Sequence, residues 1–78
     1  MNLEIISPEK KVYSGQAESI TLPGLNSGLF TILDHHAPII SVLDKGILTY
    51  TVKREKIEVE IHGGFVEARN NQVSVCIE

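Results

Sequence analysis

The stretch KIEVEIH at residues 56–62 places apolar Ile57, Val59 and Ile61 between charged or polar neighbours. Successive side chains of a β-strand point to opposite faces, so a period of two gives one apolar face and one polar face. An amphipathic helix would instead repeat its apolar residues every 3.6 positions. Residues 56–62 therefore predict a strand that is buried on one side only.

The same alternation recurs at residues 72–78 (QVSVCIE), 19–22 (SITL) and 3–5 (LEI). Residues 36–43 (HAPIISVL) are more uniformly apolar. Pro38 has no N–H to donate to a ladder, so it belongs at an edge or at the start of a strand. Nearly the whole chain therefore has a strand period.

Turn-forming residues separate these runs. Asn70-Asn71 predicts a type I′ hairpin, because asparagine tolerates the positive φ which that turn requires. Arg54-Glu55 is expected to form a second tight hairpin, Gly63-Gly64 a bulge or bend, and residues 23–28 a loop. Many short strands, regular turns and no helical segment predict an all-β sandwich or barrel.

Length and composition exclude several classes of protein. Seventy-eight residues predict a single domain, 1–78, with one thin core and little room for a deep cavity. The formal net charge is −3 and the longest basic runs are Lys10-Lys11 and Lys53-Arg54, which argues against nucleic-acid binding. One cysteine allows no internal disulfide.

No segment is typical of a secretion signal or a membrane span. Glu4 and Pro8 interrupt any signal-type apolar region, and no basic residues precede it. No stretch approaches the ~20 apolar residues that cross a bilayer as a helix. We expect a soluble protein on the reducing side of a membrane, attached to that membrane only through a partner.

Candidate catalytic and metal-binding residues are few. His35 and His36 are adjacent, so in a strand they point to opposite faces, and His62 is distant in sequence with no ligand-type spacing. A Cys76–His62 pair is possible, but Cys76 fits a small residue tolerated in a sheet. Glu58 and Glu60, with Lys56, fit a solvated strand face better than an acid–base pair. We expect neither catalysis nor a metal site.

Two segments have more apolar residues than a thin core needs. The loop after Gly24 contains Leu25, Leu29 and Phe30, and apolar residues on an exposed loop indicate a partner surface. Residues 37–43 are apolar at positions of both parities. They predict either a strand with one face on a partner, or a strand buried on both sides or covered at its edge within the domain.

Several of these stretches resemble the epsilon subunit of F-type ATP synthases. The resemblance is carried by residues 3–15 (LEIISPEKKVYSG), by ITLPG from Ile20 with GLFTIL from Gly28, by HAPII at residues 36–40, and by GGFVE at residues 63–67 with NQVSV after it. The resemblance covers essentially the whole chain. The combination of HAPII and GGFVE at this spacing is specific, whereas each motif alone is weak.

The resemblance implies a fold and a role. The fold would be two packed, mainly antiparallel five-stranded sheets. The role would be that of a non-catalytic rotor subunit in the central stalk, which binds the gamma subunit and the ring of c subunits. It would couple ion-driven rotation to ATP synthesis while peripheral to the cytoplasmic face of a bacterial inner membrane. No cofactor and no ATP binding are expected.

The resemblance also implies which residues contact each partner. The gamma subunit would contact Ser7, His36, Ala37, Pro38 and Ile40. The c ring would contact the loop formed by Leu25, Asn26, Ser27, Gly28, Leu29 and Phe30. The family often has an acidic residue in this loop and a helical hairpin after the sandwich. Here the loop is uncharged and the sequence stops at Glu78, so we expect no inhibitory hairpin.

Two other functions fit a small β-sandwich. A stand-alone module that binds a small ligand or carbohydrate would need a concave face with exposed aromatic residues, and the chain has no Trp, two Tyr and two Phe. A small hydrolase would need clustered polar catalytic groups, which the sequence does not indicate. Co-purification with gamma and the c ring would distinguish these alternatives from the rotor subunit.

Overall fold

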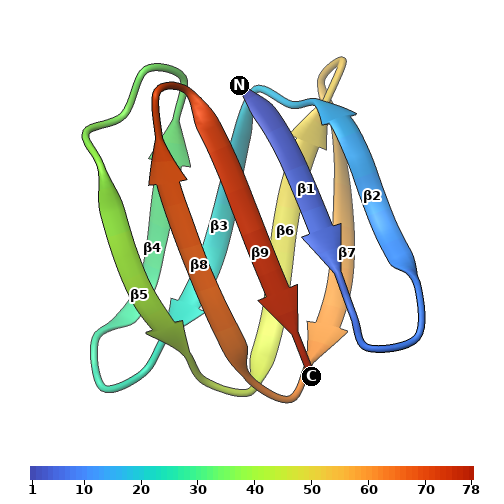
Figure 1. Ribbon diagram of the computed structural model, residues 1–78, viewed down its shortest axis with the longest axis vertical. Helices are drawn as coiled ribbons and strands as arrows, with labels where there is room; N and C mark the ends of the chain where they lie inside the picture. The colour runs from blue at the N-terminus through green and yellow to red at the C-terminus, as the bar shows by residue number, and fades with distance from the viewer.

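The computed structural model describes residues 1–78 and contains nine β-strands and no helix (Figure 1). No helix of the length and apolarity needed to cross a bilayer occurs in it. The prediction of an all-β chain is confirmed. The strands are β1 (Asn2–Ile6), β2 (Lys11–Gln16), β3 (Ser19–Gly24), β4 (Gly28–Leu33), β5 (Ile39–Leu43), β6 (Gly46–Val52), β7 (Glu55–Ile61), β8 (Gly64–Arg69) and β9 (Gln72–Ile77).

The strands form two facing layers. The front layer in Figure 1 has the order β2-β1-β9-β8-β5, and the back layer has the order β4-β3-β6-β7. β1 and β9 are parallel, and all other neighbours are antiparallel. The predicted sandwich is confirmed, with five strands in one layer and four in the other. The back layer has four because β5 pairs along its length with β8 and meets β3 only where Leu43 lies opposite Gly24.

The core lies between the layers and comes from the alternating positions that the sequence indicated. Sixteen apolar residues are buried in one cluster. The cluster contains the alternating apolar residues of three predicted strands: Leu3 and Ile5, Ile20 and Leu22, and Val73, Val75 and Ile77. In β7 only Ile61 is fully buried, while Ile57 is exposed. β7 is an edge strand that pairs only with β6, so its first half extends past the core.

The hairpin turns follow the backbone rules with one shift. Asn70 and Asn71 have φ of 53° and 59°, which confirms the predicted type I′ geometry. The other tight turn is centred on Lys53 and Arg54, with φ of 50° and 69°, and not on Arg54-Glu55. Glu18 explains the shift, because its carboxylate accepts the backbone N–H groups of Lys53 and Arg54 at 3.0 and 2.9 Å.

The predicted bend at Gly63-Gly64 links β7 to β8. Gly64 has φ of +145°, a conformation that side chains rarely adopt, and a Cβ there would lie 2.1 Å from the Cys76 carbonyl oxygen. Only glycine fits this approach of β8 to β9. The bend carries the chain from the back layer to the front layer.

Candidate interaction surface

The strand directions divide the loops between two ends of the sandwich. β1, β9 and β5 run in the same direction, because β1 is parallel to β9 and β8 is antiparallel to both β9 and β5. We call the end where these strands finish the lower end, as in Figure 1, and the end where they begin the upper end. The turn after β1 and the loop after β3 are at the lower end, and the connection from β4 to β5 is at the upper end.

The predicted c-ring residues are contiguous at the lower end, but only residues 25–27 form the loop, because β3 extends to Gly24 and β4 begins at Gly28. Asn26 and Gly28 have positive φ of 61° and 76°, which lets the chain reverse from β3 into β4. The side chains of Leu25 and Leu29 are exposed, Leu29 by 69%. Phe30 is half-buried and packs against the core. The exposed apolar part of this segment is therefore Leu25 and Leu29.

The predicted gamma residues do not all lie together. His36, Ala37 and Pro38 are exposed at the upper end, and Ile40 follows on β5 with 76% of its surface exposed. Ser7 lies at the lower end, on the opposite side of the sandwich from β5. Its hydroxyl donates to the Lys10 carbonyl at 3.2 Å and accepts from the Lys10 N–H, so it closes the turn between β1 and β2.

Sequence reasoning missed part of the exposed apolar surface. Val42 on β5 lies opposite Phe65 on β8, and their side chains are 56% and 50% exposed. The same row continues across β9 and β1 through half-buried Cys76 and Ile6. The signal was present in residues 39–43, which lack alternation, but the sequence did not show which face was uncovered.

The exposed apolar residues gather on one flank. We call the side formed by β4 and β5 the β4–β5 flank (left in Figure 1), and the side formed by β2 and β7 the β2–β7 flank. The β4–β5 flank, with the loop before β4, has five of the eight large exposed apolar side chains: Leu25, Leu29, Leu33, Ile40 and Val42. The sequence allowed that residues 37–43 form a strand buried on both sides. The exposed side chains of Ile40 and Val42 exclude this for β5.

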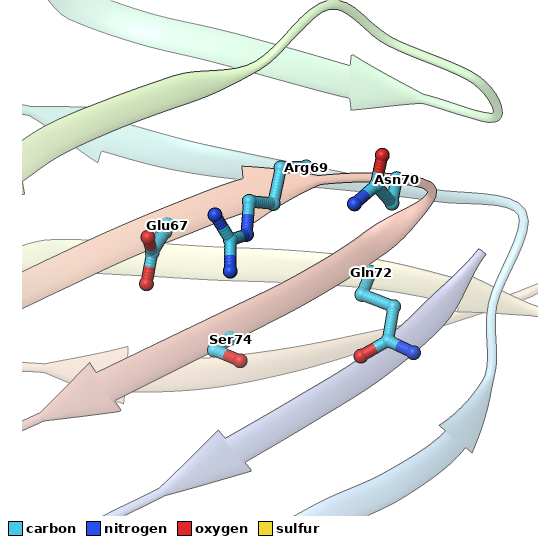
Figure 2. A pocket seen from close by; sticks show the side chains of 5 residues that line it. All are labelled: Glu67, Arg69, Asn70, Gln72 and Ser74. Atoms are coloured by element: carbon cyan, nitrogen blue, oxygen red, sulfur yellow. The ribbon is translucent and has the colours of Figure 1, made fainter.

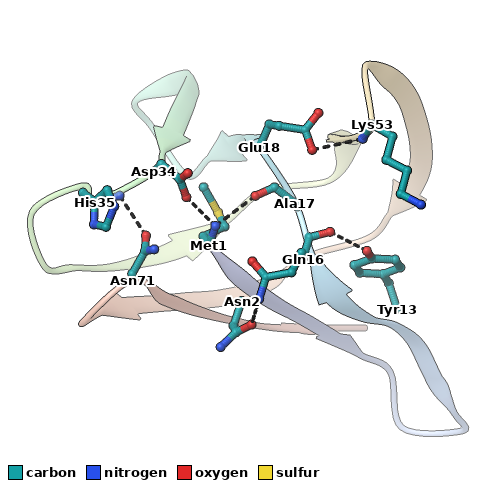
Figure 3. A network of polar contacts seen from close by, with 10 residues as sticks. All are labelled: Met1, Asn2, Tyr13, Gln16, Ala17, Glu18, Asp34, His35, Lys53 and Asn71. Carbon is teal, nitrogen blue, oxygen red and sulfur yellow. Dashed lines mark hydrogen bonds and ion pairs between the residues drawn. The ribbon is translucent and has the colours of Figure 1, made fainter.

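A polar network holds the upper end together (Figure 3). The α-amino group of Met1 donates to the Ala17 carbonyl at 3.0 Å and to the Asp34 carboxylate. This hydrogen bond from the α-amino group is the main reason why the pKa of Asp34 lies below its ordinary value. The backbone N–H of His35 donates to the Asn71 side chain at 2.8 Å. These contacts hold in place the connection between β4 and β5, which contains residues 36–38.

A second carboxylate of this network also acts structurally. The backbone N–H groups of Arg54 and Lys53 lower the pKa of Glu18, since hydrogen bonds to a carboxylate favour its charged form. The Glu18 carboxylate forms hydrogen bonds with the turn between β6 and β7 and does not line a cleft. The perturbed acids of this sandwich therefore anchor turns.

A polar depression lies on the outer face of β8 and β9 (Figure 2). It measures about 350 Å³ and is lined by Glu67, Arg69, Asn70, Gln72 and Ser74, with no apolar residue. Small-molecule sites are usually enclosed and mostly apolar, so this surface does not favour the ligand-binding alternative. The histidines do not converge either: His62 is at the lower end, and His35 and His36 are at the upper end.

The chain matches the family described as the ATP synthase delta/epsilon chain β-sandwich domain over residues 1–78. It belongs to this family. Among ATP synthase epsilon chains, it is 41% identical to that of Leptospira borgpetersenii over 100% of its length, and 35% identical to that of Synechococcus over 99%. It spans 61% and 55% of the length of those two relatives.

Two solved structures contain a chain with the same fold. One is a Euglena gracilis mitochondrial ATP synthase (OSCP/F1/c-ring), with a TM-score of 0.91, 21% identity, and coverage of 99% of this chain and 49% of that one. Another is the central stalk and c ring of the Tetrahymena thermophila mitochondrial ATP synthase, with a TM-score of 0.83, 21% identity, and coverage of 99% and 62%. At this identity the likeness establishes the fold.

Proposed function

We propose that this sandwich belongs to a non-catalytic rotor subunit of an F-type ATP synthase. The carrying observation is the family match over all 78 residues, together with relatives called ATP synthase epsilon chain. A chain of the same fold occurs in a structure described as a central stalk and c ring. In this role the domain couples ion-driven rotation of the c ring to ATP synthesis through gamma, and the chemistry takes place on other subunits.

We assign the two partners to the two ends of the β4–β5 flank. Residues 25–30, which are the loop after β3 and the start of β4, contact the c ring, and His36, Ala37, Pro38 and Ile40 contact gamma. Two observations support this assignment: both segments lie on one uncharged flank, and both present exposed apolar side chains. Ser7 lies at the other end of the sandwich from residues 36–38. If gamma contacts Ser7 as well, it must extend along the sandwich, whose longest extent is 25 Å.

The sandwich suits the transmission of torque. A close-packed interior resists deformation, so residues 1–78 act as one rigid domain between the two contacts. We place the domain on the cytoplasmic face of a bacterial inner membrane, held there through the c ring. It needs no nucleotide, metal ion or other cofactor for this role.

Charge substitutions on the exposed side chains test the assignment. Ile40→Asp should weaken binding to purified gamma, and Leu29→Asp should weaken assembly with the c ring, because each places a charge in an apolar contact. The matched control is Ile57→Asp, at an exposed isoleucine on the β2–β7 flank. Binding is measured by surface plasmon resonance for gamma and by co-purification for the ring.

The outcomes separate the surface from the role. Loss of gamma binding with Ile40→Asp but not with Ile57→Asp supports the gamma contact at β5. Unchanged binding of both partners by Ile40→Asp and Leu29→Asp, with native circular dichroism, contradicts the surface. If the unaltered protein binds neither gamma nor the c ring, the rotor role itself is wrong.

A further inference from the structure

One edge of β5 is open over its first half. β5 pairs with β8 from Ile39 to Leu43, and on its other side only its end is occupied. There Val42 accepts the N–H of Leu25 at 2.9 Å, and Asp44 donates to Pro23 at 2.9 Å. Before Val42, no strand lies on this side.

The backbone groups of Ile40 face that open edge. In an antiparallel ladder, residues alternate between bonding one neighbour and pointing their N–H and C=O to the other side. The Val42 carbonyl points away from β8, toward Leu25, so the groups of Ile40, two residues earlier, point the same way. The Ile40 N–H and C=O, together with the Val42 N–H, therefore have no strand partner within the chain.

A groove also lies next to this part of the strand, over β5 and its paired neighbour β8 and not along the open edge itself. It measures about 400 Å³ and is lined by Pro38, Ile39, Ile40, Glu67, Ala68 and Arg69. β7 protects its own edge with charged residues, and no groove of this size lies beside β4, the other uncharged edge. The unpaired main-chain groups are the feature that a strand-adding partner uses, and the groove across β5 and β8 can take side chains of such a partner.

We propose that gamma binds by adding an extended, uncharged segment to the open edge of β5, with its main chain bonded to Ile40. This inference rests on the proposed function for the identity of the partner. The free N–H and C=O of Ile40, with the Val42 N–H further along the edge, favour an extended main chain as the occupant, because its donors and acceptors repeat at the spacing of a ladder. The exposed Ile40 side chain determines its apolar character.

A second copy of this chain does not fit the same edge. Two antiparallel β5 strands related by a two-fold axis at Ile40 would place Pro38 of one copy opposite Val42 of the other. Leu25 already occupies the position beside Val42 through its own hydrogen bond. Pro38 also has no N–H to offer. In this register, which pairs the free groups of Ile40, the edge therefore favours a strand from a different protein.

Two substitutions at Ile40 separate main-chain pairing from side-chain contact. Ile40→Pro removes the outward N–H, at an edge position where a sheet tolerates proline. It should weaken gamma binding about tenfold or more, since a lost hydrogen bond and a displaced strand exceed ~1.4 kcal/mol. Ile40→Val keeps the main chain and should weaken binding no more than about fourfold, the effect of one buried methylene. Calorimetry measures both.

Amide hydrogen exchange provides a readout that does not depend on the Ile40→Pro variant folding. The Ile40 amide should exchange fast in the free protein and slowly with gamma bound, while the Ser41 amide, which faces β8, is protected in both states. Gamma binding with an unprotected Ile40 amide, or with equal losses for Ile40→Pro and Ile40→Val, overturns strand addition and leaves the rotor role intact. A dimer of the free protein in sedimentation, protected at Ile40, also overturns it. No gamma binding by the unaltered protein defeats the proposed function itself.

Discussion

The β4–β5 flank and the β2–β7 flank close the same sandwich but differ in charge. Asp34 is the only Asp, Glu, Lys or Arg between residues 19 and 43, which include β4 and β5. β7 alone has four such residues, at positions 55, 56, 58 and 60, and β2 begins with Lys11. Both flanks end in edge strands, so the fold itself does not require this difference.

The difference shows what charge does at a sheet edge. Charged side chains on an edge strand discourage pairing with other chains, and their absence leaves the edge available. The β2–β7 flank is protected in this way, whereas the β4–β5 flank combines an open edge with exposed Ile40 and Val42. An apolar edge that the fold does not bury is therefore best explained by a partner.

The largest expected effect tests whether exposed β5 side chains are dispensable for folding. Leu43 is 3% exposed, and Leu43→Ala should cost about 2–5 kcal/mol of unfolding free energy through lost burial and a cavity. Ile40→Ala, on the same strand, should cost less than about 1 kcal/mol, within the range of strand propensity. Urea unfolding measures both. Similar costs would mean that Ile40 belongs to the core, and the comparison of flanks would fail.

A smaller effect concerns the protective charges of β7. Replacing Glu58 and Glu60 together by threonine keeps strand propensity but removes charge from this edge, so aggregation on heating should become faster. Ile40→Lys adds a charge to the open edge and should make aggregation slower. Light scattering during a temperature ramp compares the rates, corrected for each variant's unfolding temperature. Equal rates in all three proteins would show that edge charge is not protective here.

The strands with alternating apolar and polar residues were predictable from the sequence, because the alternation itself shows which face of the strand is buried. The buried residues of 3–5, 19–22 and 72–78 follow directly from their alternation. The Asn70-Asn71 turn was also predictable, since its geometry depends on those two residues. The turn at Lys53-Arg54 was not, because Glu18, distant in sequence, holds it in place.

The candidate surface was only partly predictable, for a related reason. The apolar residues at 37–43 were compatible with a partner surface. However, when both faces of a strand are largely apolar, the sequence does not show which face is buried in the core. The parallel pairing of β1 with β9, which separates Ser7 from His36, joins the two ends of the sequence. No local pattern records such a pairing. Phe65 was missed because the sequence does not show that it lies on the outer face of β8, in one row with Val42.

The smallest expected effect concerns the stability of the turn between β6 and β7 on the β2–β7 flank, and this effect depends on pH. The folded-state pKa of Glu18 lies below its ordinary value, so its carboxylate stabilises the fold above that ordinary pKa. The contribution is lost as the pH falls through the lowered folded-state pKa. Glu18→Gln should therefore lower the melting temperature at pH 7, and the difference from the unaltered protein should shrink on acidification. Asp34, whose pKa is also lowered, is present in both proteins, so most of its own contribution cancels from this difference.

A matched control and a rescue complete this test. Glu58→Gln removes a charge from β7 without touching the hydrogen bonds between Glu18 and the turn, so the melting temperature at pH 7 should change little. Lys53→Asn with Arg54→Gly supplies the residues that a type I′ turn favours. In that background Glu18→Gln should cost less, because the turn no longer depends on the carboxylate. An equal cost in both backgrounds would mean that Glu18 stabilises something other than the turn.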